Sequence, residues 1–149
     1  MKTFVKIVLL FSVCSLFLFT TSCSKKTDSA PIRMFSEADT TEVLQLTDNF
    51  MKLVQAKEYD LAFNLLYNLK DDLSNYRPEQ KEILKQQFQT FPVLAYKLEE
   101  YSFKHVSNVT VTYSYEIFEK DSLSNIPNTM RITFCPERRN NIWYLGLGK

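Results

Sequence analysis

The sequence predicts an α+β domain in which three N-terminal helices pack on a bent, four-stranded antiparallel sheet. Two observations carry this prediction. Apolar residues recur every three or four positions between residues 39 and 91, as on one face of a helix, and they alternate with polar residues after Pro92, as in a strand. Helices that precede strands, rather than alternate with them, are typical of a segregated α+β layout.

The first predicted helix begins at Asp39, because Glu42 three places on completes a pattern in which two free backbone N–H groups are satisfied reciprocally. Its apolar stripe is formed by Val43, Leu46, Phe50, Leu53 and Val54. A shorter helix after Asp60 repeats this spacing with Ala62, Leu65, Leu66 and Leu69. The third helix is expected to open at Pro78, a favoured first helical residue, and to stop before Pro92.

The strand pattern is strongest over residues 109–117, where every second residue is apolar. Before it, the alternation changes phase at Glu99 and Glu100, which predicts a β-bulge that would bend the sheet. Met130, Ile132 and Phe134 mark a third strand. A polar turn over residues 137–141, which includes Arg138 and Arg139 as solvated side chains, is expected to lead into a fourth strand over residues 142–147.

The N-terminus resembles the signal peptide of bacterial lipoproteins. Lys2 and Lys6 precede an apolar run over residues 7–19, and small polar residues then lead to Cys23. The resemblance implies that residues 1–22 are removed and that Cys23 carries a diacylglycerol and an acylated amine, with the lipid bilayer as its partner. A membrane-spanning helix and an ordinary secretory signal are the alternatives. The run is shorter than the roughly 20 residues that a span needs, which argues against the first of them.

Residues 23–37 are expected to form the acylated cysteine and a flexible tether, because few of them are apolar. Residues 38–149 are then a single domain. The resemblance to lipoproteins also suggests the location. Ser24, Lys25 and Lys26 stand where surface-exported lipoproteins of some Gram-negative bacteria carry acids. We therefore expect the protein to lie in the cell envelope of a Gram-negative bacterium, at the periplasmic face of the outer membrane. Attachment to the inner membrane is the alternative.

Composition excludes several classes of function. The eighteen Lys and Arg residues nearly balance the seventeen Asp and Glu residues, which argues against a nucleic-acid partner. Once residues 1–22 are removed and Cys23 is acylated, Cys135 is the only thiol left, so no internal disulfide is expected. One histidine and one free cysteine supply no recognised metal-ligand spacing, and no glycine-rich phosphate loop is present. No metal and no cofactor are predicted.

Three features resemble the nuclear-transport-factor-2-like superfamily of cone-shaped, cystatin-like folds. They are the capped first helix, the charged Tyr59-Asp60 step within residues 57–62, and the Asn141-to-Tyr144 segment after a polar turn. The resemblance covers most of residues 39–148. It implies a long first helix lying across a strongly bent sheet, with an apolar pocket on the concave side.

Aromatic residues at strand spacing are the candidates for lining such a pocket: Tyr96, Tyr101, Tyr113, Tyr115 and Trp143. The alternative is that these side chains simply fill the core. His105 is the only histidine and hence the candidate general base, as the resemblance to steroid-isomerase-like members implies, although no partner can be named for it.

The expected function is that of a membrane-anchored, non-catalytic binding or assembly module, with an unknown protein or a small apolar ligand as partner. One alternative is a small isomerase- or hydratase-like enzyme, which needs an enclosed cavity and a carboxylate within hydrogen-bond reach of a tyrosine or His105. Another is an inhibitor-like interaction protein that uses the hairpin connection at residues 120–127.

Overall fold

The computed structural model describes residues 35–70, 73–104, 108–120 and 126–148. All of them belong to one compact unit that spans residues 33–149. Cys23 and His105 lie outside the described residues, as does most of the connection at 120–127. The expectations for these positions are therefore not addressed by the structure.

The first described helix, α2 (Glu37–Gln55), is capped by Ser36. The Ser36 hydroxyl accepts the Asp39 backbone N–H at 3.2 Å, and the Asp39 carboxylate accepts the Ser36 backbone N–H at 2.9 Å. The prediction that Asp39 itself caps the helix was wrong. Ser36 and Asp39 form the same reciprocal pair that was expected of Asp39 and Glu42, but they form it one turn earlier.

The second helix, α3 (Tyr59–Phe63), is shorter than the apolar spacing predicted. Leu66 is fully buried beside Leu145, and the Tyr67 backbone N–H donates to the Leu145 carbonyl at 2.8 Å. Pairing with the C-terminal segment draws this part of the chain out of the helix, so that Leu69 is not helical.

The third helix, α4 (Pro78–Thr90), confirms the predicted limits. Pro78 occupies its first turn, and the helix ends just before Phe91 and Pro92. The residues that precede Pro92 follow the expected rule, because the proline ring disfavours helical geometry in the residue before it.

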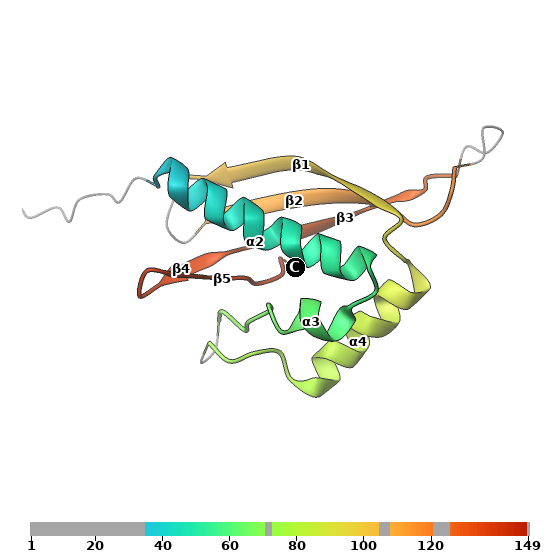
Figure 1. Ribbon diagram of the computed structural model, residues 1–149, viewed down its shortest axis with the longest axis horizontal. Coiled ribbons are helices and arrows are strands. Elements are labelled where there is room, and N and C mark those ends of the chain that lie inside the picture. Colours follow the sequence, from blue (N-terminus) through green and yellow to red (C-terminus); the bar gives the residue numbers. More distant parts are fainter. Residues whose placement is uncertain (1–34, 71–72, 105–107, 121–125, 149) are drawn as a thin grey trace, which may run out of the picture. The chain divides into compact units, whose positions relative to one another are not determined.

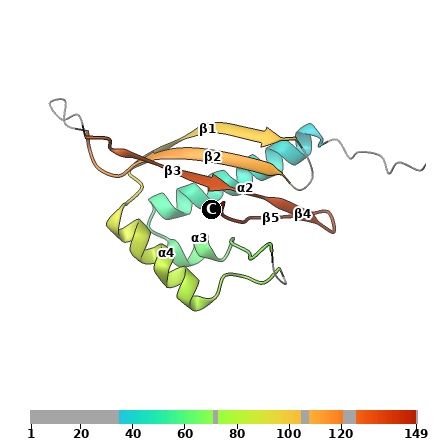
Figure 2. The same cartoon turned by 180° about the vertical axis from the view of Figure 1, so that it is seen from behind.

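Three antiparallel strands form the main sheet in the order β1 (Ala95–Phe103), β2 (Val109–Glu116) and β3 (Thr129–Phe134). The register between β1 and β2 shifts between Leu98 and Glu100, which confirms the predicted bulge. Figures 1 and 2 show α2 lying along one face of this sheet, with α3 and α4 beyond it. The α+β class, with helices packed against an antiparallel sheet, is confirmed.

A hairpin of β4 (Glu137–Arg139) and β5 (Ile142–Tyr144) follows β3. Its turn is Asn140-Asn141, whose φ angles of 51° and 64° are those of a tight type I′ connection. The predicted turn over residues 137–141 was too long. Asparagine tolerates the left-handed backbone conformation, so two residues close the hairpin and the residues before them join a strand.

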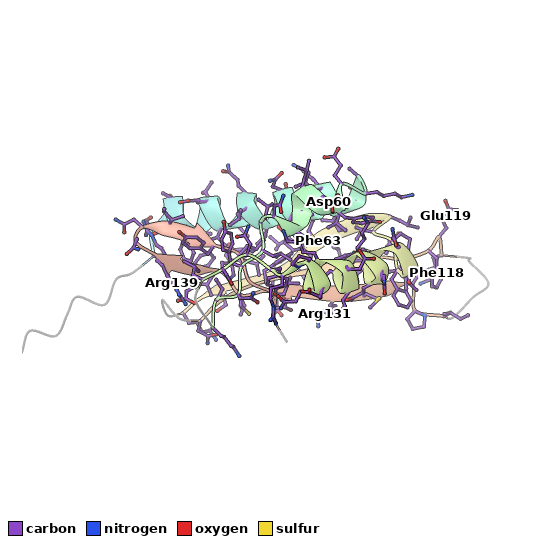
Figure 3. The ribbon with its side chains drawn as sticks, turned by 90° about the horizontal axis from the view of Figure 1, so that it is seen from below. Asp60, Phe63, Phe118, Glu119, Arg131 and Arg139 are labelled. Atoms are coloured by element: carbon purple, nitrogen blue, oxygen red, sulfur yellow. The ribbon has the colours of Figure 1, made fainter. Side chains whose placement is uncertain are left out.

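The core fills the space between the helices and the inward face of the sheet. Phe50 of α2 is fully buried and meets Phe134 of β3 edge to face, with ring centroids 5.1 Å apart. Phe63 and Phe88 bring α3 and α4 into the same cluster, with centroids 6.3 Å apart. Figure 3 shows Phe63 among the side chains that crowd this interior. Within the described ranges, none of the helices has the length and apolar character needed to cross a membrane.

Candidate functional site

The structure places three of the five predicted aromatic residues, Tyr113, Tyr115 and Trp143, in the core. Tyr113 and Tyr115, on β2, are 3% and 2% exposed. The Tyr113 ring packs against Phe134, and the Tyr115 ring against Phe88, with centroid distances of 6.1 and 6.2 Å. Their rings thus fill the space that an enclosed pocket would need.

Tyr96, Tyr101 and Trp143 lie in different places. Tyr96 is half-buried and packs its ring edge to face on Tyr113, at 5.8 Å. Tyr101 is 53% exposed. Trp143 is buried at the opposite end, where its ring centroid lies 5.7 Å from that of Phe35. The structure therefore brings Tyr96 and Tyr113 together and leaves Tyr101 and Trp143 apart from them.

A polar network surrounds the pair of tyrosines. The Tyr96 hydroxyl donates to Asp48 at 2.9 Å, and Lys52 contacts the other carboxylate oxygen of Asp48 at 2.7 Å. The Thr47 hydroxyl uses its proton on backbone carbonyls of its own helix, so the Tyr113 hydroxyl, 3.2 Å away, is the donor to Thr47.

This network provides a carboxylate beside a tyrosine, as the enzyme alternative requires, but the pKa shifts of the two groups disfavour proton transfer between them and a substrate. Burial alone would raise the pKa of Asp48, yet the hydrogen bonds from Lys52 and Tyr96 outweigh it and lower that pKa. Burial, and then the hydrogen bond to Asp48, raise the pKa of Tyr96. Asp48 is thus a poor base and Tyr96 a poor acid at neutral pH.

A second network joins α2 to the β4–β5 hairpin. The Asp39 carboxylate accepts from the Arg138 guanidinium at 2.5 Å and from the Trp143 indole N–H at 3.3 Å. Backbone and side-chain hydrogen bonds from Ser36 lead the effects that lower the pKa of Asp39, although burial opposes them. The Arg138 guanidinium also lies 5.9 Å from the centre of the Trp143 ring.

This contact corrects the expectation for the arginine pair. Arg138 is not a solvated turn residue, because its strand holds it against a buried carboxylate. Arg139 bonds Glu137 at 2.8 Å and reaches the Leu69 carbonyl as well. Both arginines hold the hairpin in place, which is a structural task.

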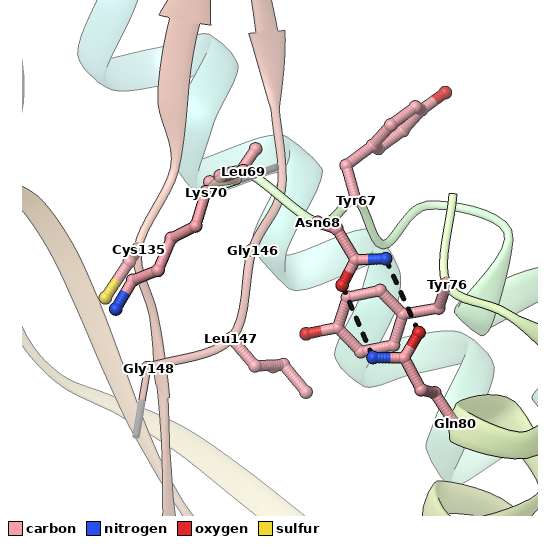
Figure 4. Close-up of a pocket in the computed structure, with 10 residues that line it drawn as sticks. All are labelled: Tyr67, Asn68, Leu69, Lys70, Tyr76, Gln80, Cys135, Gly146, Leu147 and Gly148. Carbon is pink, nitrogen blue, oxygen red and sulfur yellow. Dashed lines mark hydrogen bonds between the residues drawn. The ribbon is translucent and has the colours of Figure 1, made fainter. Parts of the chain in front are cut away.

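An open recess of about 540 Å³ lies where the segment after α3 passes the C-terminal residues (Figure 4). We call it the Tyr76 recess, and its lining residues are Tyr67, Asn68, Leu69, Lys70, Tyr76, Gln80, Cys135, Gly146, Leu147 and Gly148. A smaller hollow of about 320 Å³ beside α4 shares Leu147 and Gly148 with it and is bordered by Tyr115. Tyr115 is thus a predicted aromatic that reaches the wall of this neighbouring hollow.

The polar groups of the recess gather at two ends. Asn68 and Gln80 exchange two amide hydrogen bonds of 3.4 Å at one end. At the other end, Figure 4 shows the Lys70 ammonium beside the Cys135 sulfur. Burial raises the pKa of the Cys135 thiol, and Lys70 only partly opposes this. The thiol is therefore protonated at neutral pH, which does not suit a nucleophile.

Sequence reasoning missed the Tyr76 recess. Asn68 and Tyr76 lie in a segment without a periodic pattern, and Gln80 lies on a helix face that looked merely polar. One signal was available: the chain has only two glycines, and both of them, Gly146 and Gly148, line the recess. Glycines in a strand often mark a close approach of another group.

Among the described residues, no group of three or more His, Cys, Asp or Glu side chains could hold a metal ion. Comparison with models of protein families, with curated proteins and with solved structures found no match to the chain. The fold and the site define an α+β protein whose helices pack against an antiparallel sheet and whose C-terminal edge carries an open recess.

Proposed function

We propose that the protein is a membrane-anchored, non-catalytic lipoprotein of the cell envelope that acts as a binding or assembly module through the Tyr76 recess. The observation that carries the proposal is the recess itself. It combines apolar walls with hydrogen-bonding groups and is open to solvent, whereas the tyrosines on β2 are packed into the core. Concave sites with apolar walls and a few polar groups are typical of ligand binding.

The predicted anchor at Cys23 supports the proposed location at a membrane. The N-terminal pattern that ends at Cys23 is the one expected of a lipoprotein. Several acyl chains would hold the protein firmly, whereas a single chain gives only marginal binding. The lysines that follow Cys23 favour the periplasmic face of the outer membrane in a Gram-negative cell.

The cone-like, cystatin-like form is part of the same proposal. The Cys135 N–H donates to the Gly146 carbonyl, and the Gly148 N–H donates to the Thr133 carbonyl, each at 2.8 Å. These bonds support a fourth strand beside β3. The bulge in β1 supports the bend that such a sheet needs.

Site-specific photocrosslinking in intact cells tests the binding module. A photoreactive amino acid replaces Gln80 at the recess or, as the matched control, the exposed Lys97 on β1. We expect a defined adduct from position 80 that is absent from position 97. The same adducts from both positions, or none from position 80, would contradict the proposal.

A second candidate function is the small isomerase- or hydratase-like enzyme, because Asp48 lies within hydrogen-bond reach of Tyr96. Its pKa directions disfavour proton transfer at neutral pH. Exchange of α-protons of a small ketone into deuterated water provides the test. If exchange is catalysed by the wild type and abolished in Asp48→Asn, the enzyme replaces the binding module as the preferred function.

A further inference from the structure

The Tyr76 recess lies along one edge of the C-terminal segment. Backbone bonds from Cys135 and to Thr133 attach residues 146–148 to the end of β3 on one side. On the other side, the chain after Tyr67 leaves the segment just past Leu145. The recess occupies the space that opens there, and its volume of about 540 Å³ is in the range of small-molecule sites.

Glycine allows this edge to be lined by backbone. A Cβ atom at Gly146 would lie 2.6 Å from the Leu69 side chain, so only glycine lets Leu69 approach this closely. At Gly148 the nearest side chain to an added Cβ would be Cys135, whose sulfur would be 3.3 Å away. Side chains larger than glycine at positions 146 and 148 would project toward Leu69 and Cys135 and narrow the recess.

The apolar wall of the recess is formed by aromatic and aliphatic side chains that pack on one another. The Tyr67 ring packs edge to face on Tyr144 at 5.0 Å, and Figure 4 shows the Tyr76 ring beside the Leu147 side chain. Burial raises the pKa of the Tyr76 phenol, and a hydrogen bond from the Leu147 backbone only partly opposes this. This wall suits a flat or slender apolar body.

The charge of the recess selects the other part of a ligand. None of its ten lining residues is acidic, and Lys70 is a cation. Among the described residues, Lys70 takes part in none of the five ion pairs. A ligand cation would meet like charge here, whereas an anion would meet an exposed ammonium group.

From this arrangement we infer that the Tyr76 recess binds a small monocarboxylate with an apolar body. The carboxylate contacts Lys70, and the body lies against Tyr76 and Leu147. The inference rests on the proposed function and names the class of ligand for the same site.

The test uses 4-phenylbutyrate and its uncharged analogue 4-phenylbutan-1-ol as probes, with the full chain in lipid nanodiscs and empty nanodiscs as the blank. Dissociation constants are measured by ligand-observed NMR. We expect the acid to bind about fivefold more tightly than the alcohol, the size of effect that a partly exposed charge pair gives. Lys70→Met should remove this preference, Lys70→Arg should keep it, and the matched control Lys97→Met should change nothing.

A second measurement places the probe. Saturating 4-phenylbutyrate should slow the alkylation of Cys135 by iodoacetamide. Peptide mass spectrometry measures the rate of this alkylation. Equal affinity for acid and alcohol, or unchanged alkylation of Cys135 at saturation, would overturn the inference. If the probe fails while the adduct from position 80 is still formed, only the ligand class is wrong. Loss of both results rejects the proposed function too.

Discussion

At the scale of single residues, Asp39 connects the start of the first described helix to the last hairpin. Its carboxylate accepts hydrogen bonds from Ser36 in the cap, from Arg138 on β4 and from Trp143 on β5. Buried charges are tolerated when they are paired and hydrogen-bonded. Removal of one partner leaves the other charge buried without a partner, which is destabilising. Asp39 is therefore a stability residue rather than a binding residue.

The lowered pKa of Asp39 makes folding stability depend on pH. A carboxyl with a lowered folded-state pKa contributes stability that is present above its unfolded pKa of about 3.9 and is lost as pH falls through the folded value. We predict that Asp39→Asn destabilises the protein at pH 7 by about 1–3 kcal/mol and flattens the loss of stability as pH falls through and below the unfolded pKa of Asp39.

Urea unfolding at a series of pH values measures both effects. Asp60→Asn, on the exposed face of α3, is the matched control and should leave the pH profile as it is. A wild-type profile and an Asp39→Asn profile that run parallel from pH 7 to pH 2 would rule out this role for Asp39.

At the scale of elements, the β4–β5 hairpin depends on its two-residue turn. Both Asn140 and Asn141 have positive φ angles, which asparagine adopts at a moderate cost and glycine adopts without one. We predict that Asn141→Gly raises the free energy of unfolding by about 0.5 kcal/mol, since Asn-Gly is a preferred type I′ pair. Asn141→Val should lower it, because a β-branched residue is strained there. Thermal unfolding by circular dichroism compares the three proteins, and equal midpoints would contradict the turn assignment.

The C-terminal segment gives a second prediction at this scale. Gly146→Ala would place a methyl group against the Leu69 side chain, and we expect a loss of about 1–2 kcal/mol from the resulting overpacking. Leu69→Ala should relieve most of this loss in the double variant. A double-mutant cycle in urea measures the coupling, and additive losses would show that the two residues are not in contact.

Patterns within the sequence predicted elements better than their ends. The stripe on α2, the start of α4 and the bulge near Glu99 follow from local spacing, so they could be predicted. The end of α3 could not, because Leu66 fits a helix equally well and leaves it only through its pairing with Leu145. Tertiary contacts decide such cases.

The candidate site was harder to predict than the fold. Alternation marks Tyr113 and Tyr115 as inward-facing, but it cannot distinguish the wall of a pocket from a filled core, and the structure shows them packed in the core. Residues such as Asn68 and Gln80 come together only when the chain after α3 folds back beside α4. No local pattern carries that information.

At the scale of the whole molecule, the proposed attachment to a membrane depends on Cys23. We predict that Cys23→Ser moves the protein from the detergent phase to the aqueous phase in a Triton X-114 separation, because the proposed acyl chains would supply the membrane affinity. Cys135→Ser is the matched control and should stay in the detergent phase. Mass spectrometry that finds residues 1–22 intact and no fatty chains on the wild type would contradict the anchor.

The contacts of Asp39 also bear on the order in which the chain can fold. They span 99 residues to Arg138 and 104 residues to Trp143, so the first described helix is fastened by a hairpin that is synthesised long after it. Contacts at such separation close late. A nascent chain that stops before Arg138 has no partner for Asp39, so this end of α2 is secured only after the β4–β5 hairpin has been made.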